Sequence, residues 1–321
     1  MTDLIEGARA GATARHGEQA GPLDVTIVLP CYNEQDHVLL ELERISKAME
    51  NSPFSYELMV IDDKSTDGTL AVLREAQPRF PHMRLVAFQR NGGSGTARRI
   101  GTAEARGGIV VWTDADMTYP NERIPEFVQY LLDNPDTDQV VGARTREQGT
   151  YKFLRVPAKW TIRKIAEQLA GTRIPDLNSG LRAFRREVAL PYLRLLPPGF
   201  SCVTTITMSF LSNQHTVDYL PIDYAKRAGT SKFHFVRDAY RYILQVLRMV
   251  MYFNPIKVLM PVALTLLAIG TAKAIFDVIR YAIVVHAWFH VTTNAVLLVV
   301  SGLIIASVAL LADLIVRSRG D

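Results

Sequence analysis

Cysteine is scarce in this chain, since only Cys31 and Cys202 occur among its 321 residues. Two cysteines cannot build a disulfide framework or a cysteine-based zinc site. This scarcity fits a protein that works in a reducing compartment, because disulfides persist mainly in oxidising ones. We therefore expect the fold to depend on a hydrophobic core, for which a chain of this length is sufficient.

A large excess of charge of one sign is also missing. The chain has 36 basic and 32 acidic side chains and a formal net charge of +4. It contains no run rich in lysine and arginine and no alternation of basic and aromatic residues. Because such patterns mark nucleic-acid-binding surfaces, we expect no nucleic-acid partner. Residues 1–23 lack an apolar segment, so they do not resemble a signal peptide and are expected to form a flexible tail.

Two common phosphate-binding signatures are absent. The glycine-rich segment Asn91–Gly95 lacks the G-x-G-x-x-G spacing of a dinucleotide-binding fold, and it has no P-loop lysine. These absences argue against a dinucleotide-dependent enzyme and a P-loop kinase. A flexible turn and direct contact with a phosphate are both compatible with this segment alone.

Short apolar runs alternate with segments of helical periodicity along the first two thirds of the chain. The apolar runs are typical of buried strands, which we expect at residues 25–30, 56–61, 84–88, 109–112, 139–142 and 219–224. Helical spacing of apolar residues predicts helices at 38–49, 70–73, 96–105, 124–132 and 157–170. This alternation predicts an α/β fold with a largely parallel, doubly wound sheet.

Polar residues follow three of these strands at the point where each strand ends, in Tyr32–Glu34, Asp62–Thr69 and Asp114–Asp116. Ligands of open α/β sheets bind at the carboxyl ends of the strands, so this pattern indicates a nucleotide crevice. Asp114 and Asp116 lie two positions apart and can point to the same ligand from an extended chain. Two carboxylates suit Mg²⁺ or Mn²⁺, with phosphate oxygens completing the shell. Taken alone, the motif is better explained by a solvated acidic turn.

The C-terminal part of the chain is much more hydrophobic. Residues 233–255 combine an apolar stripe with several arginines, which predicts an interfacial amphipathic helix, although a core helix fits the same pattern. Two long apolar segments follow within 256–316, and we expect transmembrane helices at about 257–279 and 294–316. Lys273 in the first span is expected to pair with Asp277 or to extend to the membrane surface.

Basic residues are unevenly placed around the two expected spans. Arg248 and Lys257 precede the first span, and Arg317 and Arg319 follow the second, whereas the segment 284–293 has neither lysine nor arginine. The positive-inside rule therefore places the domain before the spans, both termini and the tail 317–321 in the cytoplasm. We expect an integral protein of the plasma membrane.

Six motifs in the chain resemble a known family when they are read together. Four of them, in this order, are similar to the signature of family 2 glycosyltransferases of the GT-A fold: Leu29–Glu34, Asp62–Thr69, Asn91–Ala97 and Asp114–Asp116. Two more, Asp176–Arg182 and Arg227–Lys232, resemble the polyprenyl-phosphate branch, which includes dolichol-phosphate mannose synthases and undecaprenyl-phosphate glucosyltransferases. The resemblance covers about residues 24–255. It implies a Rossmann-like, mostly parallel GT-A domain at 24–232 and a role in the biosynthesis of cell-envelope glycans.

The resemblance also implies roles for single residues. Those implied to bind the nucleotide sugar are Pro30, Tyr32, Glu34, Asp62, Asp63, Asp114, Ala115 and Asp116. Asp62 would contact the base or ribose, with Asp63 as its neighbour or as a structural cap. Asp114 and Asp116 would bind Mn²⁺ or Mg²⁺. Thr118 stands where many relatives have a glutamine ligand and is the third expected metal contact.

The implied acceptor is undecaprenyl or dolichyl phosphate. A phosphate monoester is largely a dianion at neutral pH, so it needs positive charge around it rather than a strong general base. The expected contacts of this phosphate are Arg144, Ser179, Arg182, Arg227 and Lys232. For each basic residue the alternative is an ordinary ion pair, and for Ser179 it is the cap of a turn. Asp116, Arg144 and Arg227 are the expected catalytic residues.

The implied reaction is an inverting transfer from a donor of the GDP-mannose or UDP-glucose type. One alternative is a processive polysaccharide synthase, but Gln245–Met249 lacks the tryptophan of that family's motif and two spans are too few for a polymer channel. A second alternative is a non-catalytic membrane scaffold. The sequence does not specify the sugar, the nucleotide or the lipid length. Relatives with two spans can be oligomers, so a homo-oligomer is a further expectation.

Overall fold

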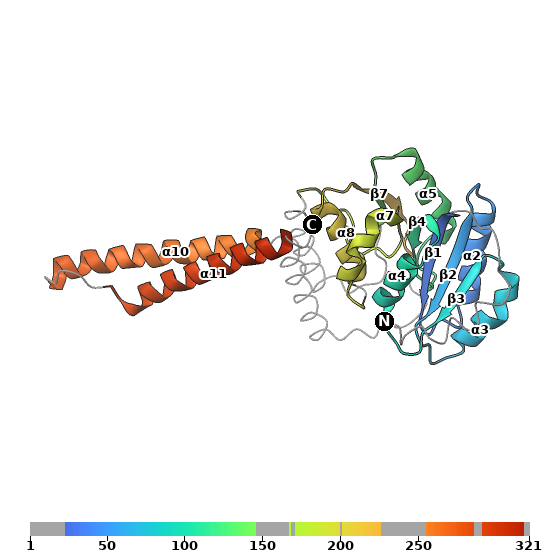
Figure 1. Cartoon of the computed structure of the whole chain (residues 1–321), viewed down its shortest axis with the longest axis horizontal. Coiled ribbons are helices and arrows are strands. Elements are labelled where there is room, and N and C mark those ends of the chain that lie inside the picture. The colour runs from blue at the N-terminus through green and yellow to red at the C-terminus, as the bar shows by residue number, and fades with distance from the viewer. Residues whose placement is uncertain are drawn as a thin grey trace. The chain divides into compact units, whose positions relative to one another are not determined.

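The computed structural model describes residues 23–145, 167, 171–199, 201–225, 255–285 and 291–317. The chain divides into two compact units, Met1–Phe233 and His234–Asp321, which are described separately. The first contains a β-sheet covered by helices, and the second contains a pair of long helices (Figure 1).

The first unit is built on a seven-stranded sheet with the order β3-β2-β1-β4-β6-β5-β7. The strands are β1 (Leu23–Cys31), β2 (Tyr56–Asp62), β3 (Met83–Ala87), β4 (Gly107–Trp112), β5 (Gln139–Arg144), β6 (Arg182–Arg185) and β7 (Val217–Ile222). β6 runs antiparallel to β4 and β5, and the other pairings of the described strands are parallel. The predicted mostly parallel sheet is therefore confirmed.

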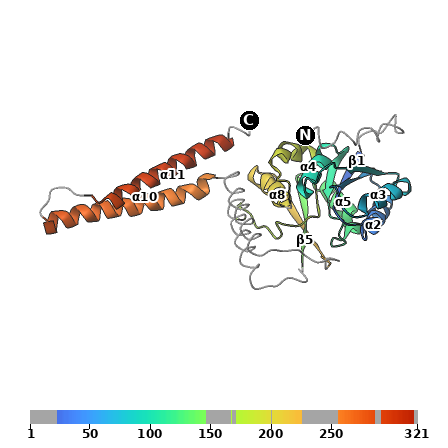
Figure 2. The same ribbon diagram turned by 90° about the horizontal axis from the view of Figure 1, so that it is seen from below.

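Helices cover both faces of this sheet. On one face lie α2 (Val38–Glu50), α3 (Thr69–Ala76) and α5 (Ile124–Asp133), and on the other lie α4 (Ser94–Ala103), α7 (Arg186–Ala189) and α8 (Cys202–Ser212) (Figures 1 and 2). Each face has its own buried apolar cluster. Each fully buried valine, leucine or isoleucine contributes about 1.5–3 kcal/mol. Because the central strands are buried on both faces, their sequences are continuous apolar runs rather than alternating patterns.

Two elements of this unit did not show in the sequence pattern. β6 begins and ends with arginine. A charged residue predicts an exposed position, but Arg182 is fully buried, so the sequence pattern did not indicate a strand here. α8 is rich in threonine and other β-branched residues, which have low helix propensity, yet it is a buried helix stabilised by packing. The predicted helices at 157–170 and 233–255 lie outside the described residues, apart from Glu167 and Pro255.

The strand order brings the three polar strand ends to one edge. β1 lies between β2 and β4, and its register pairs Cys31 with Asp62 and Val28 with Trp112. The segments after these strands therefore begin side by side. Asp63 continues this contact, because its N–H donates to the carbonyl of Cys31 at 2.9 Å.

The second unit is a helical hairpin of α10 (Pro255–Arg280) and α11 (Thr293–Arg317), with a π-helical turn at Tyr281–Val285. Glycines allow the helices to pack closely: a Cβ on Gly270 would lie 2.9 Å from the backbone nitrogen of Val299, and one on Gly302 would lie 3.0 Å from the carbonyl of Ala263. Both helices are long and apolar enough to cross a membrane, and little of their apolar surface is buried. They are candidate membrane spans at the predicted positions.

A polar contact joins the two helices of the hairpin. The Lys273 ammonium lies 2.8 Å from one oxygen of Asp277, as the sequence predicted. The other oxygen of Asp277 accepts a hydrogen bond from the hydroxyl of Thr292 at 2.5 Å and another from its N–H at 3.3 Å. Asp277 thus ties α10 to the residue that directly precedes α11.

Candidate active site

The loops after β1 and β2 are bonded to each other. Asn33 has a left-handed backbone (φ 58°), and its side-chain oxygen accepts a hydrogen bond from the N–H of Thr66 at 2.8 Å. The Glu34 N–H donates to the hydroxyl of Thr69 at 2.9 Å. These contacts fix two of the predicted nucleotide-binding segments as one surface. Tyr32 is 46% exposed on it, so its ring is accessible to a ligand.

Asp62 is almost completely buried at the end of β2. Its Oδ2 accepts a hydrogen bond from the Ser65 N–H at 3.2 Å. Its Oδ1 has no hydrogen-bond partner among the residues that the structure describes. A buried polar atom without a partner costs about 1–3 kcal/mol, so this oxygen is a place where an N–H or O–H of a ligand would be stabilising. That property fits the predicted contact with a base or ribose.

Asp63 is the structural cap of the glycine-rich turn. Its two carboxylate oxygens accept hydrogen bonds from the N–H groups of Gly92 at 2.6 Å and Gly93 at 2.8 Å. Burial raises the pKa of Asp63, and these two hydrogen bonds offset part of that rise. The Gly95 N–H in turn donates to the carbonyl of Pro198 at 2.7 Å. Because these N–H groups bind the protein itself, the geometry favours a structural turn over a phosphate cradle.

Asp114 is turned toward a buried arginine that the sequence did not reveal. Arg98 on α4 is fully buried, and its Nη2 donates to Asp114 Oδ1 at 2.5 Å. Its guanidinium also lies 5.6 Å from the centre of the Trp112 ring. Burial alone would lower the pKa of Arg98, but Asp114 raises it, so the arginine stays charged. In the sequence Arg98 stands next to Arg99, and such a pair is typical of an exposed helix face.

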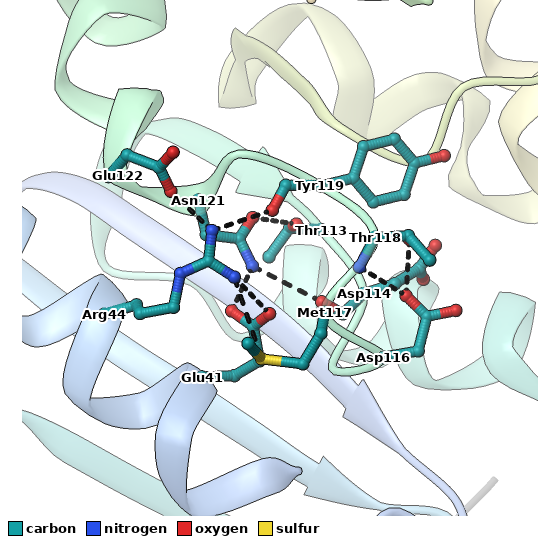
Figure 3. A network of polar contacts seen from close by, with 10 residues as sticks. All are labelled: Glu41, Arg44, Thr113, Asp114, Asp116, Met117, Thr118, Tyr119, Asn121 and Glu122. Carbon is teal, nitrogen blue, oxygen red and sulfur yellow. Dashed lines mark hydrogen bonds and ion pairs between the residues drawn. The ribbon is translucent and has the colours of Figure 1, made fainter. Parts of the chain in front are cut away.

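Asp116 is oriented by the residue two positions later. The Thr118 hydroxyl donates to Asp116 Oδ1 at 2.5 Å, and the Thr118 N–H donates to the same oxygen at 3.3 Å (Figure 3). Met117 between them has a left-handed backbone with φ of 62°, which is uncommon for a residue with a side chain. The structure shows Thr118 in contact with Asp116. Direct contact of Thr118 with a metal stays a prediction.

The surroundings of these carboxylates fit a divalent cation that is shared with a phosphate ligand. Burial raises the pKa of the Cys31 thiol, and the nearby carboxylates of Asp62, Glu34 and Asp114 raise it further. Within the described part of the chain, no group of three or more acidic, histidine or cysteine side chains could hold a metal. A cation held by one or two carboxylates and completed by phosphate oxygens matches this donor set.

The predicted motif Asp176–Arg182 contacts residues 113–121, which follow β4 and carry Asp114 and Asp116, and which we call the acidic loop. The N–H of Gly180 donates to the hydroxyl oxygen of Tyr119 at 2.6 Å. A Cβ on Gly180 would lie 2.5 Å from Asp114 Oδ2, so only glycine fits at this position. Two motifs that are far apart in the sequence therefore form one site.

Arg144 is bound to a carboxylate of the same motif. Its Nε and Nη2 donate to the two oxygens of Asp176 at 2.6 and 2.9 Å, and its guanidinium lies 5.2 Å from the centre of the Tyr224 ring. Burial alone would raise the pKa of Asp176, but the Arg144 guanidinium holds it below its usual range. The structure thus shows the ion pair that the sequence left as the alternative. Contact of Arg144 with a phosphate stays a prediction.

Arg182 and Ser179 lie in the interior. Arg182 donates to the carbonyl of Val203 at 2.6 Å, to the hydroxyl of Thr207 at 2.7 Å and to the carbonyl of Ser179. Burial lowers the pKa of Arg182 to about 10. The hydroxyl of Ser179 is buried and has no hydrogen-bond partner among the described residues. Contact of either side chain with a lipid phosphate therefore needs a rearrangement of this loop.

Several predicted site residues have simpler placements. Pro30 pairs with Ile61 inside the sheet, and Ala115 is buried between the two aspartates. Arg227 and Lys232 lie outside the described residues. Arg98 is a functional candidate that the sequence did not indicate. Asp176 and Gly180 belong to a predicted motif, but the sequence did not indicate that they lie against Arg144 and Asp114.

The strand order and the acidic strand ends are those of the GT-A fold, which is used by a class of enzymes that transfer sugars from nucleotides. The chain belongs to glycosyl transferase family 2, whose sequence profile matches residues 26–192. Residues 254–318 match a second profile, the GtrB C-terminal hairpin. The hairpin of α10 and α11 is therefore a recurring module rather than a peculiarity of this chain.

Two curated relatives are each 28% identical to this chain over the aligned residues. The dodecaprenyl-phosphate galacturonate synthase of Rhizobium johnstonii is 28% identical over 233 residues, which are 72% of this chain and 67% of the relative. The undecaprenyl-phosphate 4-deoxy-4-formamido-L-arabinose transferase of Pectobacterium atrosepticum is 28% identical over 67% of this chain and 64% of the relative. The chain thus spans about two thirds of these relatives.

Solved structures confirm the fold. Glucosyl-3-phosphoglycerate synthase from Mycobacterium tuberculosis, in complex with Mn²⁺ and UDP-glucose, superposes with a TM-score of 0.56 at 19% identity, over 71% of this chain and 79% of that one. The same enzyme with Mn²⁺, UDP and glucosyl-3-phosphoglycerate gives a TM-score of 0.56 at 18% identity, over 71% and 80% of the two chains. At this identity the likeness concerns the fold alone.

Proposed function

We propose that this protein transfers a sugar from a nucleoside diphosphate to a polyprenyl phosphate at the cytoplasmic face of the plasma membrane. The observation that carries the proposal is the convergence of Asp62, Asp114 and Asp116 at one edge of the sheet, in a chain that also has a candidate membrane hairpin. The names of both relatives support it, since each describes sugar transfer to or from a polyprenyl phosphate carrier.

The nucleotide is assigned to the joined loops after β1 and β2. Tyr32 offers an exposed ring for stacking, and Asp62 offers its unpaired carboxylate oxygen to an N–H or O–H of the base or ribose. Pro30 and Glu34 shape the same surface. Asp63 is assigned an indirect role, because its carboxylate binds the glycine-rich turn and holds it in place. A nucleotide of either the UDP or the GDP type fits this assignment.

The diphosphate is assigned to the acidic loop. Asp116 and Asp114 would hold Mn²⁺ or Mg²⁺ there, and when bound the cation would offset the charge that develops on the departing nucleoside diphosphate. Thr118 orients the Asp116 carboxylate through its hydroxyl. Arg98 keeps Asp114 in one rotamer and partly balances its charge, so Asp116 is the better placed of the two to reach a cation.

The lipid phosphate is the nucleophile. An oxygen of its dianion attacks the anomeric carbon while the bond from that carbon to the diphosphate oxygen breaks, and the electron pair leaves with the nucleoside diphosphate. No proton has to move and no enzyme nucleophile is needed, so a single displacement inverts the anomeric configuration. We assign Arg227, Lys232 and Arg144 to the binding of this phosphate.

The membrane segments would bring the site to its substrate. The hairpin of α10 and α11 would anchor the protein, and residues 233–255 would lie as an amphipathic helix at the headgroup level, where the lipid phosphate is found. The basic residues on both sides of the hairpin support a cytoplasmic position for the catalytic domain, on the side where nucleotide sugars are made.

The experiment is nucleotide release by the full-length protein in detergent or nanodiscs. UDP-sugars and GDP-sugars are supplied with undecaprenyl phosphate and Mn²⁺, and the free nucleotide is measured. Release should require both the lipid phosphate and the cation, and Asp116→Asn should abolish it. Asp133→Asn is the matched control, because Asp133 is exposed on α5 and should leave release unchanged. Unchanged activity in Asp116→Asn would refute the assignment of the acidic loop.

A further inference from the structure

A buried carboxylate from another element lies beneath the acidic loop. Glu41 on α2 is fully buried, and each of its oxygens accepts one hydrogen bond: Oε1 from Arg44 Nη1 at 2.9 Å and Oε2 from Asn121 Nδ2 at 2.7 Å (Figure 3). Neither Glu41 nor Arg44 belongs to the family-like motifs of the sequence. Both are connected to the loop that carries Asp116.

Asn121 connects Glu41 to the two ends of this loop. Its side-chain oxygen accepts a hydrogen bond from the hydroxyl of Thr113 at 2.5 Å, and its Nδ2 also lies 3.4 Å from the carbonyl of Asp114. Thr113 and Asn121 are themselves fully buried. The Asn121 side chain therefore closes the loop at its base, and Glu41 fixes the orientation of that side chain.

Arg44 connects Glu41 to the middle of the loop. Its Nη2 donates to the carbonyl of Tyr119 at 3.3 Å and to Glu122 at 2.5 Å, and its Nη1 lies 3.7 Å from the sulfur of Met117. Met117 is the residue with the left-handed backbone directly after Asp116. The guanidinium thus contacts the loop where its backbone conformation is least favourable.

We propose that Glu41 is a positioning residue for the acidic loop. Through Asn121 and Arg44 it holds the loop in the conformation in which Asp116 binds the metal. A buried charge is costly even when it is paired, and apolar residues could fill the same space. Here both carboxylate oxygens of Glu41 accept hydrogen bonds from side chains, those of Arg44 and Asn121, that also contact the acidic loop. Residues behind metal ligands commonly change metal affinity by 10- to 100-fold when they are removed. The inference rests on the proposed function, in which Asp116 binds a divalent cation.

The test measures Mn²⁺ binding rather than activity. The full-length protein in nanodiscs is titrated with Mn²⁺ in the presence of UDP or GDP, and free Mn²⁺ is followed by electron paramagnetic resonance. Glu41→Ala should weaken Mn²⁺ binding by about tenfold or more. Glu43→Ala is the matched control, since Glu43 lies on the same helix and pairs with Arg79 at the surface. Its Mn²⁺ affinity should stay within about twofold of the wild type.

A second, milder variant covers the case in which Glu41→Ala does not fold. Thr113→Val keeps the volume of the side chain but removes the hydrogen bond to Asn121. It should also weaken Mn²⁺ binding, by a smaller factor. In both variants, saturating Mn²⁺ should restore most of the nucleotide release. A role in stability alone would instead lower the melting temperature and the active fraction, with an unchanged Mn²⁺ affinity in the folded protein.

The outcomes distinguish a failure of the positioning role of Glu41 from a failure of the proposed function. Wild-type Mn²⁺ affinity in folded Glu41→Ala and Thr113→Val would overturn the positioning role and leave the proposed function standing. Absence of Mn²⁺ binding by the wild-type protein, with either nucleotide, would overturn the metal assignment and the positioning role together. Weaker binding in both variants, with the Glu43→Ala control intact, is the result expected here.

Discussion

Gly180 offers a sharp test of the site, because a single methyl group added there would meet the carboxylate of Asp114, a predicted metal ligand. In Gly180→Ala the new Cβ would lie 2.5 Å from Asp114 Oδ2 and 3.1 Å from the nearest ring atom of Tyr119. Asp114 cannot simply rotate away, since its other oxygen is held by Arg98 at 2.5 Å. The acidic loop or the Gly180 loop must therefore move.

The size of the effect follows from the cost of overpacking. Such insertions cost about 1–3 kcal/mol. If this cost is expressed in the transition state, kcat/KM falls by roughly 5- to 150-fold. Lipid-dependent nucleotide release gives kcat/KM, and thermal unfolding shows whether the variant is folded. Gly108→Ala is the control, because a Cβ there meets nothing within 4 Å in the described part of the chain. Wild-type kcat/KM in Gly180→Ala would refute the contact between the two motifs.

Three further predictions concern the groups around the site. Arg98→Met leaves Asp114 without its buried partner and should lower the free energy of unfolding by about 3 kcal/mol, measured by denaturant titration. Asp63→Ala frees two N–H groups of the glycine-rich turn, and it should cost about 2 kcal/mol in the same measurement and speed proteolysis at that turn. The lowered pKa of Asp176 means that its pair with Arg144 stabilises the fold above about pH 4 and that this contribution is lost as the pH falls through the lowered value. Arg144→Met should therefore reduce the loss of stability between pH 5 and pH 2; an unchanged acid profile would contradict the pair.

Much of the sheet could be predicted from the sequence because its central strands are buried on both faces. Such strands are continuous apolar runs, and the polar residues that follow them stand out clearly. The positions expected for β1, β2 and β4 agree with the structure to within two residues. The alternation of strands and helices is enough to predict that the three polar strand ends lie at one edge of the sheet, because parallel strands end at the same edge.

β6 and α8 were not predicted, because what stabilises them is contact with residues that are distant in the sequence. β6 is short and begins with Arg182, whose charge is satisfied by carbonyl and hydroxyl oxygens of α8 and the preceding loop. α8 is rich in β-branched side chains, which disfavour a helix, and most of these side chains are buried. Tertiary packing overrides propensity in both cases.

The site itself shows the same limit. The pattern indicated which residues are candidates for binding and catalysis, but it could not indicate the side chains that they contact. Arg98 and Asp114 meet because α4 and the end of β4 lie side by side, and Arg144 meets Asp176 across 32 positions of sequence. A lone arginine in a sequence cannot be assigned to a phosphate or to a carboxylate without this geometry.

The most direct test of the proposed function is the mass of the lipid product. Full-length protein is incubated with undecaprenyl phosphate, Mn²⁺ and each of a panel of UDP-sugars and GDP-sugars, and the lipid fraction is examined by mass spectrometry. We expect one donor class to give a new lipid whose mass equals that of undecaprenyl phosphate plus a single sugar residue. No glycosylated lipid from any donor, or a long polymer from one of them, would contradict the account.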